Sequence, residues 1–342
     1  MNIKTLDKKI TIKEIKHLNK DSSFSATGVV SRFTKRKDRN DNAFWDLSLS
    51  DSTGDLDCKI WGGANWWNLQ NGDEIPITPE DCELKFEGSV VTIAGKITEF
   101  KEQLQYNINV IYYLDQTKNS PNAFSRRSPI PDDELEEKFL NLLTQVNPPL
   151  NEFLESVFFK HNLWDDFKTF PAAVTIHHAY KAGLLEHSLS VAYLALEMAK
   201  HYNQFKIPVN QDLVIAGGLL HDIGKLQSYS YDVIPQMTLD GNLAGHIVLG
   251  YEKFMDIAKI ENLDIQLTKS LAHIIVSHHG KLEFGSPVPP TMPEAMIISA
   301  ADDLDFKLNY WRSQIEAINS QSELTDYLPL LERRFWKGYF MK

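Results

Sequence analysis

The segment from Asp115 to Asp133 divides the chain into two parts whose apolar residues follow different periods. It reads DQTKNSPNAFSRRSPIPDD, which is rich in Pro, Ser and Asn and has no periodic apolar pattern, as in a linker. A chain of 342 residues is long enough for two domains. We therefore expect a β domain over residues 1–115, a linker over 116–133, a helical domain over 134–320 and a tail over 321–342.

Five β-rich runs broken by turn residues precede the linker, over 23–33, 43–50, 54–61, 89–100 and 104–113. The second run shows the alternation clearly, because Trp45, Leu47 and Leu49 point to one face and the residues between them to the other. Five short strands in about a hundred residues predict a small closed barrel, for which the OB-fold is the most common five-stranded case.

The runs after the linker have helical apolar spacing, over 134–146, 150–161, 183–202, 211–221, 242–260 and 265–279. Gly and Pro fall mostly between them, where helix ends are expected. The predicted fold class is therefore multidomain β plus α, with an amino-terminal five-stranded β-barrel followed by an all-α helical bundle.

Histidine and aspartate residues gather at the ends of these predicted helices. In GLLHDIGK, His221 and Asp222 follow an apolar helix and Gly224 breaks it, so both side chains can converge on one metal ion. The same half of the chain also holds His187, His246, His278, His279 and Asp302. Imidazole and carboxylate are ligands for Mn, Fe, Co, Ni or Zn, and helical bundles build such sites from facing helices.

The competing interpretation is structural, because a single histidine on an apolar helix is usually a hydrogen-bonded core residue. Five polar elements in this order, each flanked by small or apolar residues, are harder to explain by packing. Burying so many imidazoles and carboxylates without a cation would cost free energy. The sequence therefore favours a metal site.

The order H…HD…H…HH…D resembles that of the HD-domain superfamily of metal-dependent phosphohydrolases. The closer resemblance is to the YhaM-type 3′→5′ exoribonucleases, which join an OB-fold to an HD domain. It is carried by the segments HHAYKAGLLEHSLSVAYLA, GGLLHDIGKL, LDGNLAGHI and IVSHHGKLEFGSPVPP, with ADDLDFKL after them. The resemblance implies an OB-fold nucleic-acid-binding domain over 1–115 and an HD domain over 134–320.

The resemblance also implies a set of metal ligands. The first ion would be held by His187, His221, Asp222 and Asp302. Asp222 would bridge to a second ion, whose other ligands would come from His246, His278 and His279, with the choice between the two adjacent histidines left open. Asp302 is preferred to Asp303 because A-D-x-L is the usual pattern of the family.

Other residues of the motifs would act on the substrate. Lys225 resembles the lysine of the HDxGK motif that contacts phosphate, so Asp222 and Lys225 are the expected catalytic residues. His177 and His178 resemble a histidine pair of the family, for which phosphate binding and a structural role have equal support.

The full ligand set separates the subclasses of the superfamily. HD nucleotidases generally keep only the first His, the HD pair and the last Asp, whereas the three further histidines favour a two-metal site suited to in-line displacement at a phosphodiester. Phosphodiesterases of the HD-GYP kind carry GYP after the paired histidines, where this chain has GKLEFGSPVPP.

The resemblance thus implies a 3′→5′ exoribonuclease with two divalent transition-metal ions, Mn first and Fe, Co or Ni as the others. A hydroxide activated by both ions would hydrolyse single-stranded RNA, and potentially single-stranded DNA, to nucleoside 5′-monophosphates. The alternatives are an HD phosphohydrolase for nucleotides or small phosphodiesters, and a non-catalytic nucleic-acid-binding protein with a structural HD domain.

The barrel offers two candidate contacts with a nucleic acid. Phe44, Lys59 and Trp61 share the strand face opposite the apolar core, where bases could stack. A loop containing Lys35, Arg36 and Lys37 could contact phosphates. The competing interpretation is that Trp61, Trp66 and Trp67 cap the barrel and that the basic loop is solvated; we favour it for Trp66 and Trp67 only.

The formal net charge of −11 argues at first against a nucleic-acid partner. Residues 1–120, however, carry 16 basic and 18 acidic side chains, so −9 of that charge lies in the part with the proposed metal ligands. Two cysteines and the lack of a long apolar run predict a cytoplasmic protein with no membrane segment. A homo-oligomer is left open.

Overall fold

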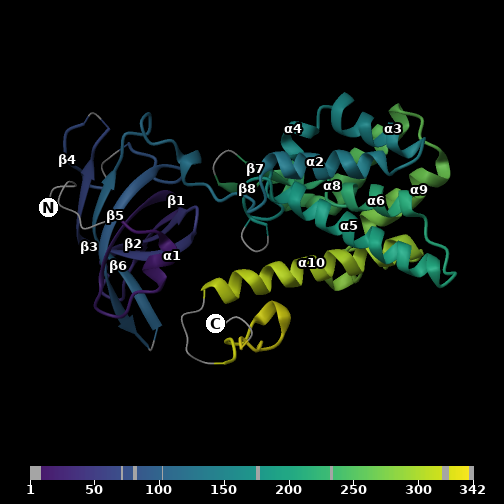
Figure 1. The fold of residues 1–342 in the computed structure, drawn as a ribbon. Coiled ribbons are helices and arrows are strands. Elements are labelled where there is room, and N and C mark those ends of the chain that lie inside the picture. The colour runs from purple at the N-terminus through teal and green to yellow at the C-terminus, as the bar shows by residue number, and fades with distance from the viewer. Residues whose placement is uncertain are drawn as a thin grey trace. The chain divides into compact units, whose positions relative to one another are not determined.

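The structure is a computed structural model that describes residues 9–70, 72–79, 83–101, 103–174, 178–231, 234–317 and 323–338. The chain divides after Arg126 into two compact units, the first drawn in purple and blue and the second from teal towards yellow (Figure 1). This division lies inside the predicted linker. Gln116, at the start of the linker, bonds to the barrel, because its side-chain amide exchanges two hydrogen bonds with the backbone of Val90.

The first unit is a closed β-barrel. Its strands are β1 (Ser23–Lys37), β2 (Ala43–Asp51), β3 (Gly54–Asn68), β4 (Ile75–Pro76), β5 (Val90–Phe100) and β6 (Gln103–Tyr113). The order along the sheet is β2-β1-β5-β6-β3-β4, and β2 also pairs with β3. The five long strands therefore close on themselves, with β3 and β6 parallel and the other long pairs antiparallel. This confirms the predicted five-stranded barrel.

The barrel core follows the alternation of the sequence. Trp45, Leu47 and Leu49 of β2 are buried. The residues of β3 that pair with them are buried in the same core: Ile60, Cys58 and Leu56. A short helix that the sequence did not suggest, α1 (Ile12–Lys16), adds Ile12 and Ile15 to the same core. Its start is fixed by a capping box between Thr11 and Glu14.

The basic segment is not a loop, as we expected from the sequence, but the end of strand β1. Lys35, Arg36 and Lys37 pair across the ladder with Trp45, Phe44 and Ala43 of β2. The strand continues because the pairing of β1 with β2 extends through this segment, and the turn to β2 begins only at Asp38. Asp38 holds that turn by accepting from the backbone N–H groups of Asn40 and Asn42.

The second unit is a helical bundle that also contains a small hairpin. Its helices are α2 (Asp132–Thr144), α3 (Leu150–Glu155), α4 (Trp164–Phe167), α5 (Gly183–Gln204), α6 (Gln211–Leu220), α7 (Lys225–Ser228), α8 (Leu239–Ile260), α9 (Ile265–Ser277) and α10 (Pro293–Ala317). The exception to the predicted all-α pattern is the hairpin of β7 (Tyr229–Tyr231) and β8 (Pro235–Met237). Helix α10, which carries Asp302, was not among the predicted segments.

Helices α5, α6, α8, α9 and α10 share one apolar core. Three of the predicted metal ligands lie within α5, α8 and α10, and the other four directly follow the ends of α6 and α9. α5 packs on α6, α6 on α9, and α8 on both α7 and α9. In the part of the chain that the structure describes, no helix is long and apolar enough to cross a membrane.

Candidate metal centre

All seven predicted metal ligands come together in the helical unit, and they form two groups around Asp222. The His187 group consists of His187, His221, Asp302 and the Oδ2 atom of Asp222. The His246 group consists of His246, His278, His279 and the Oδ1 atom of Asp222. Asp222 is buried between them, so each of its carboxylate oxygens faces a different group.

The His187 group is tightly packed. The Nε2 atom of His187 lies 3.2 Å from Asp222 Oδ2, 3.2 Å from Asp302 Oδ1 and 3.2 Å from Nε2 of His221. Nε2 of His221 is also 3.4 Å from Asp222 Oδ2. Two imidazole nitrogens and two carboxylate oxygens therefore point at one small volume, as in a preformed set of ligands.

The His246 group has polar atoms that no hydrogen bond satisfies within the described residues. Asp222 Oδ1, His246 Nε2 and His278 Nε2 are buried and make no hydrogen bond. Yet Nε2 of His246 is 3.4 Å and Nε2 of His278 is 3.6 Å from Asp222 Oδ1. Ligand atoms of His246, His278 and His279 also lie within 4.8 Å of one another. Buried unsatisfied polar atoms are unfavourable, and a cation among these atoms would remove the cost.

The backbone and Asp305 fix which nitrogen of each histidine faces the site. Nδ1 of His221 bonds to the carbonyl of Gly218, Nδ1 of His278 to that of Ile275, and Nδ1 of His279 to that of Phe284. Nδ1 of His187 bonds to the carboxylate of Asp305. With Nδ1 facing an acceptor, Nε2 is the nitrogen left for a metal ion in all four rings.

Helix ends bring these side chains together. His221 and His278 are the residues at which α6 and α9 end. Gly224 follows Asp222, and a Cβ atom there would lie 2.0 Å from the carbonyl oxygen of His246, so only glycine lets these two segments approach. Gly245 breaks the helical path of α8 at a φ of 74°, directly before His246.

Asp302 and Asp303 are separated by their positions on α10. Asp302 faces His187, whereas Asp303 points away and pairs with Lys307 at 2.5 Å. The structure therefore brings Asp302, and not its neighbour, into the cluster.

Burial keeps His246 and His278 neutral, whereas neighbouring positive charges keep the Asp222 carboxylate ionised. Burial lowers the pKa of His246 to about 3 and the pKa of His278 well below its ordinary value. Burial by itself raises the pKa of Asp222, but Lys225 and His221 outweigh it and hold that pKa well below the usual range. Neutral imidazole and ionised carboxylate are the forms that bind metal.

The imidazole of His187 carries the opposite pKa shift. Burial lowers the pKa of His187, but the carboxylates of Asp222, Asp302 and Asp305, which accept hydrogen bonds from the ring, outweigh it and leave the pKa well above its ordinary value. In the metal-free protein this imidazole is therefore protonated at neutral pH. Three carboxylates around one ring show that the position favours a positive charge.

The other motif residues lie around the cluster. Lys225 begins α7 and donates from Nζ to Asp222 Oδ2 at 2.6 Å. His178 is buried, with Nε2 bonded to Asp305 and Nδ1 to the hydroxyl of Tyr180, so in this arrangement neither ring nitrogen is available for a phosphate. His177 lies outside the described residues.

Sequence reasoning missed Asp305, Tyr180 and Glu186. Asp305 bonds to His187 and His178, and Tyr180 bonds to His178 and Glu186. Asp305 lies one helical turn after Asp302, and Glu186 directly precedes His187. The i, i+3 spacing of Asp302 and Asp305 on one helix was the available signal. It was overlooked because α10 itself was not predicted.

The barrel places three predicted substrate contacts on one face. The rings of Phe44 and Trp61 are 5.0 Å apart, and Lys59 Nζ lies 4.6 Å from the Phe44 ring. Lys59 and Arg36 both pair with Asp46, which reduces the positive charge of this face. Trp61 is 42% exposed, whereas Phe44 is buried beneath its neighbours.

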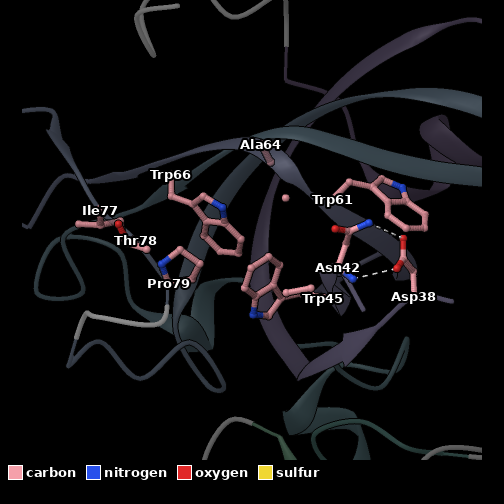
Figure 2. A pocket seen from close by; sticks show the side chains of 11 residues that line it. Asp38, Asn42, Trp45, Trp61, Ala64, Trp66, Ile77, Thr78 and Pro79 are labelled. Atoms are coloured by element: carbon pink, nitrogen blue, oxygen red, sulfur yellow. Dashed lines mark hydrogen bonds between the residues drawn. The ribbon is translucent and has the colours of Figure 1, made fainter. Parts of the chain in front are cut away.

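Beside this face lies a pocket of about 650 Å³, which the sequence did not suggest (Figure 2). Trp45, Trp61 and Trp66 contribute to its lining. Figure 2 shows Asn42 and its partner Asp38 at one end, and Thr78 with Ile77 and Pro79 at the other. The pocket thus combines flat aromatic walls with polar groups at both ends.

Known proteins are similar to this chain over its helical unit and over most of its length. An HD domain family model matches residues 184–307. The 3′-5′ exoribonuclease YhaM of Bacillus subtilis is 30% identical over 92% of this chain and 94% of its own length. The protein of the same name from Halalkalibacterium halodurans is 30% identical over 91% of this chain and 92% of its own length.

Among solved structures, the second OB-fold domain of replication protein A from Methanococcus maripaludis covers 32% of this chain and 96% of its own. It is 16% identical with a TM-score of 0.22, so the barrel is assigned from its strand pairing and not from this likeness. The match to full-length relatives, together with the HD model over the metal centre, shows that the chain belongs to the YhaM family of 3′-5′ exoribonucleases.

Proposed function

We propose that this chain is a metal-dependent exonuclease that removes nucleoside 5′-monophosphates from the 3′ end of single-stranded RNA. The observation that carries the proposal is the shared carboxylate of Asp222, whose two oxygens face two separate groups of histidines. Family relatives named as 3′-5′ exoribonucleases support the same activity.

Two divalent transition-metal ions fit the residues present. The His187 group would hold one ion through His187, His221, Asp222 and Asp302, and its three surrounding carboxylates favour positive charge. The His246 group would hold the other, because its three unsatisfied buried atoms need a cation or a donor. Mixed imidazole and carboxylate ligands suit Mn, Fe, Co or Ni, and Mn is our first candidate. When bound, such ions would lower the pKa of a water molecule and neutralise charge on a phosphodiester.

The chain's own residues would orient the reacting groups. Asp222 stays ionised at neutral pH and fixes the relative position of the two groups. Lys225 keeps its proton, because Asp222 raises its pKa against the effect of burial. One N–H of the Lys225 ammonium bonds to Asp222, so the other two can donate to a phosphate oxygen, as the motif predicts.

The barrel would hold the RNA strand. We propose that one base stacks on the exposed Trp61 and that a second enters the tryptophan-lined pocket beside it. Asn42 and Thr78, at the two ends of the pocket, would form hydrogen bonds with the edge of this base. Lys35, Arg36, Lys37 and Lys59 would contact phosphates, at a strength reduced by the ion pairs to Asp46 and Asp41.

The second candidate function is hydrolysis of nucleotides or small phosphodiesters. The His187 group by itself favours it, because one ion held by His187, His221, Asp222 and Asp302 is the set that HD nucleotidases keep. The His246 group disfavours it, since a one-ion enzyme would leave His246, His278 and His279 without an ion to bind.

The test is incubation of the purified chain with 5′-end-labelled single-stranded RNA and DNA, with Mn²⁺ and with a chelator. We expect a ladder that shortens from the 3′ end, release of nucleoside 5′-monophosphates, and loss of both with the chelator. Metal analysis of the same protein should give about two ions per chain, as a two-metal site requires. One ion per chain together with hydrolysis of mononucleotides would favour the nucleotidase, and an unchanged RNA with no bound ion would exclude both enzymes.

A further inference from the structure

A buried chain of polar side chains lies behind His187, on the side away from the other metal ligands. Nδ1 of His187 is 2.8 Å from Asp305 Oδ2, and Nε2 of His178 is 3.0 Å from the same oxygen. The second oxygen of Asp305 accepts from the hydroxyl of Ser190. Asp305 is 6% exposed and His187 is fully buried, so water does not compete for these bonds.

The chain continues beyond His178. The hydroxyl of Tyr180 is 2.9 Å from Nδ1 of His178 and donates to Glu186 at 2.9 Å. His178 has a positive φ of 47°, a conformation that costs free energy in a non-glycine residue. The backbone holds it there, since the carbonyl of His178 accepts from the N–H of Ala172. The ring of His178 is thus fixed at both nitrogens and at the backbone.

Helix α10 contacts both nitrogens of the same imidazole. Asp302 lies 3.2 Å from Nε2 of His187, and Asp305, one turn later, lies 2.8 Å from Nδ1. A ring held on both edges from one helix has a single orientation. An acceptor at Nδ1 also keeps the proton on that nitrogen when Nε2 binds an ion and makes Nε2 a stronger ligand.

We propose that Asp305 is a positioning residue for the metal ligand His187, and that His178, held by Tyr180 and Glu186, braces Asp305. This inference rests on the proposed metal site but not on the identity of the substrate. It gives His178 a structural role, in place of direct phosphate binding, because its ring is buried and both ring nitrogens are hydrogen-bonded.

The test compares Asp305→Asn and Asp305→Ala with the matched control Asp303→Asn in the full chain. Asp303 lies on the same helix two residues earlier but is exposed and pairs with Lys307, so its change alters charge equally without touching His187. Apo proteins are titrated with Mn²⁺, and free Mn²⁺ is followed by its electron paramagnetic resonance signal. Thermal unfolding of each apo protein shows whether it is folded.

We expect both Asp305 variants to bind the first ion roughly 10–100-fold more weakly, the range for residues that support a metal ligand. The second ion, at the His246 group, should bind as in the unchanged chain, and Asp303→Asn should bind both normally. On RNA, kcat should fall at limiting Mn²⁺ and recover at high Mn²⁺ while KM stays constant, because Asp305 does not face the substrate. A purely structural residue would lower apo stability without this metal-dependent recovery.

Tyr180→Phe is the second variant, which keeps the inference testable if Asp305→Ala does not fold. It removes the hydroxyl that bonds to His178 and Glu186, and we expect a smaller weakening of the first ion in the same direction. Unchanged Mn²⁺ affinity in Asp305→Asn, or equal weakening in Asp303→Asn, would overturn the proposal. Normal metal binding by the unchanged chain without RNA hydrolysis would instead overturn the proposed function alone.

Discussion

The His187 group and the His246 group differ in how the protein satisfies their polar atoms. In the His187 group the distances from the two histidine Nε2 atoms to the carboxylate oxygens of Asp222 and Asp302 are 3.2–3.9 Å, and Asp305 bonds to the other nitrogen of the His187 ring. In the His246 group three buried atoms make no hydrogen bond within the described residues. The first group is held by contacts within the protein, whereas the second leaves buried polar atoms that a cation would satisfy.

The difference shows why Asp222 is central. Its Oδ2 atom belongs to the group that is preformed, and its Oδ1 atom to the group that is unsatisfied. The His246 group is also the more open of the two, since His246 and His279 are only partly buried while His187 and His221 are completely buried. We therefore expect the first ion to bind more tightly and the second to exchange more readily.

The largest effect should come from the residue that the two groups share. Asp222→Asn removes the charge from both groups, so we expect neither ion to bind well and kcat/KM on RNA to fall by ~10³-fold or more. Metal analysis and initial rates on end-labelled RNA measure both effects. Asp303→Asn is the matched control, because it removes the same charge outside both groups. If Asp222→Asn were about as active as this control, Asp222 would not be a ligand shared by the two groups.

Removing one ligand of the His246 group should separate the two groups. His246→Gln keeps the volume of the side chain but removes a ligand, so we expect one bound ion per chain instead of two, and at least a roughly 10–100-fold loss of kcat. Equilibrium dialysis with Mn²⁺ counts the ions. Loss of both ions would show that the groups do not fill independently.

His246 and His187 should make the stability of the metal-free protein depend on pH in opposite directions. The pKa of His246 is lowered to about 3, so between pH 6.5 and about 3 the unfolded chain binds a proton there that the folded chain does not. That difference lowers stability as the pH falls. The pKa of His187 is raised, so its contribution is fully present below pH 6.5 and is lost as the pH rises through its folded pKa.

Thermal unfolding of the metal-free protein from pH 7.5 to 5 can isolate the His246 contribution. We expect the unchanged chain to lose more Tm on acidification than His246→Gln, by about 2–4 °C for each kcal/mol of lost stability. Parallel pH profiles of the two proteins would mean that His246 titrates normally in the folded state.

The smallest effect should lie outside both groups, on the barrel. Trp61→Ala removes a half-exposed stacking surface, for which we expect a rise of roughly fivefold in Kd or KM for RNA, or about 1 kcal/mol. Metal content and hydrolysis of a small phosphodiester should not change. Trp66→Phe serves as a comparison, since Trp66 is mostly buried in the barrel core.

The sequence predicted the strands and helices whose apolar residues recur with a regular strand or helix period. Alternation in β2 predicted the buried face of Trp45, Leu47 and Leu49, and the apolar helices before His221 and His278 placed these residues at helix ends. It failed for Lys35 to Lys37, because a charged segment extends a strand when its backbone pairs with a neighbour. It failed for α10, because the charged and apolar residues of that segment are mixed and its helical period is weak.

The sequence by itself determined which residue types are available, since the histidines and aspartates of the HD-type order can bind metal wherever they meet. Only the tertiary structure decided that Asp222 lies between two groups, that Asp302 faces His187 while Asp303 faces away, and that Asp305 stands behind the ring. The physical reason is that a ligand set depends on distances between side chains from different helices. Those distances are fixed by packing and by close approaches such as that of Gly224 to the backbone of His246. A local sequence pattern does not predict them.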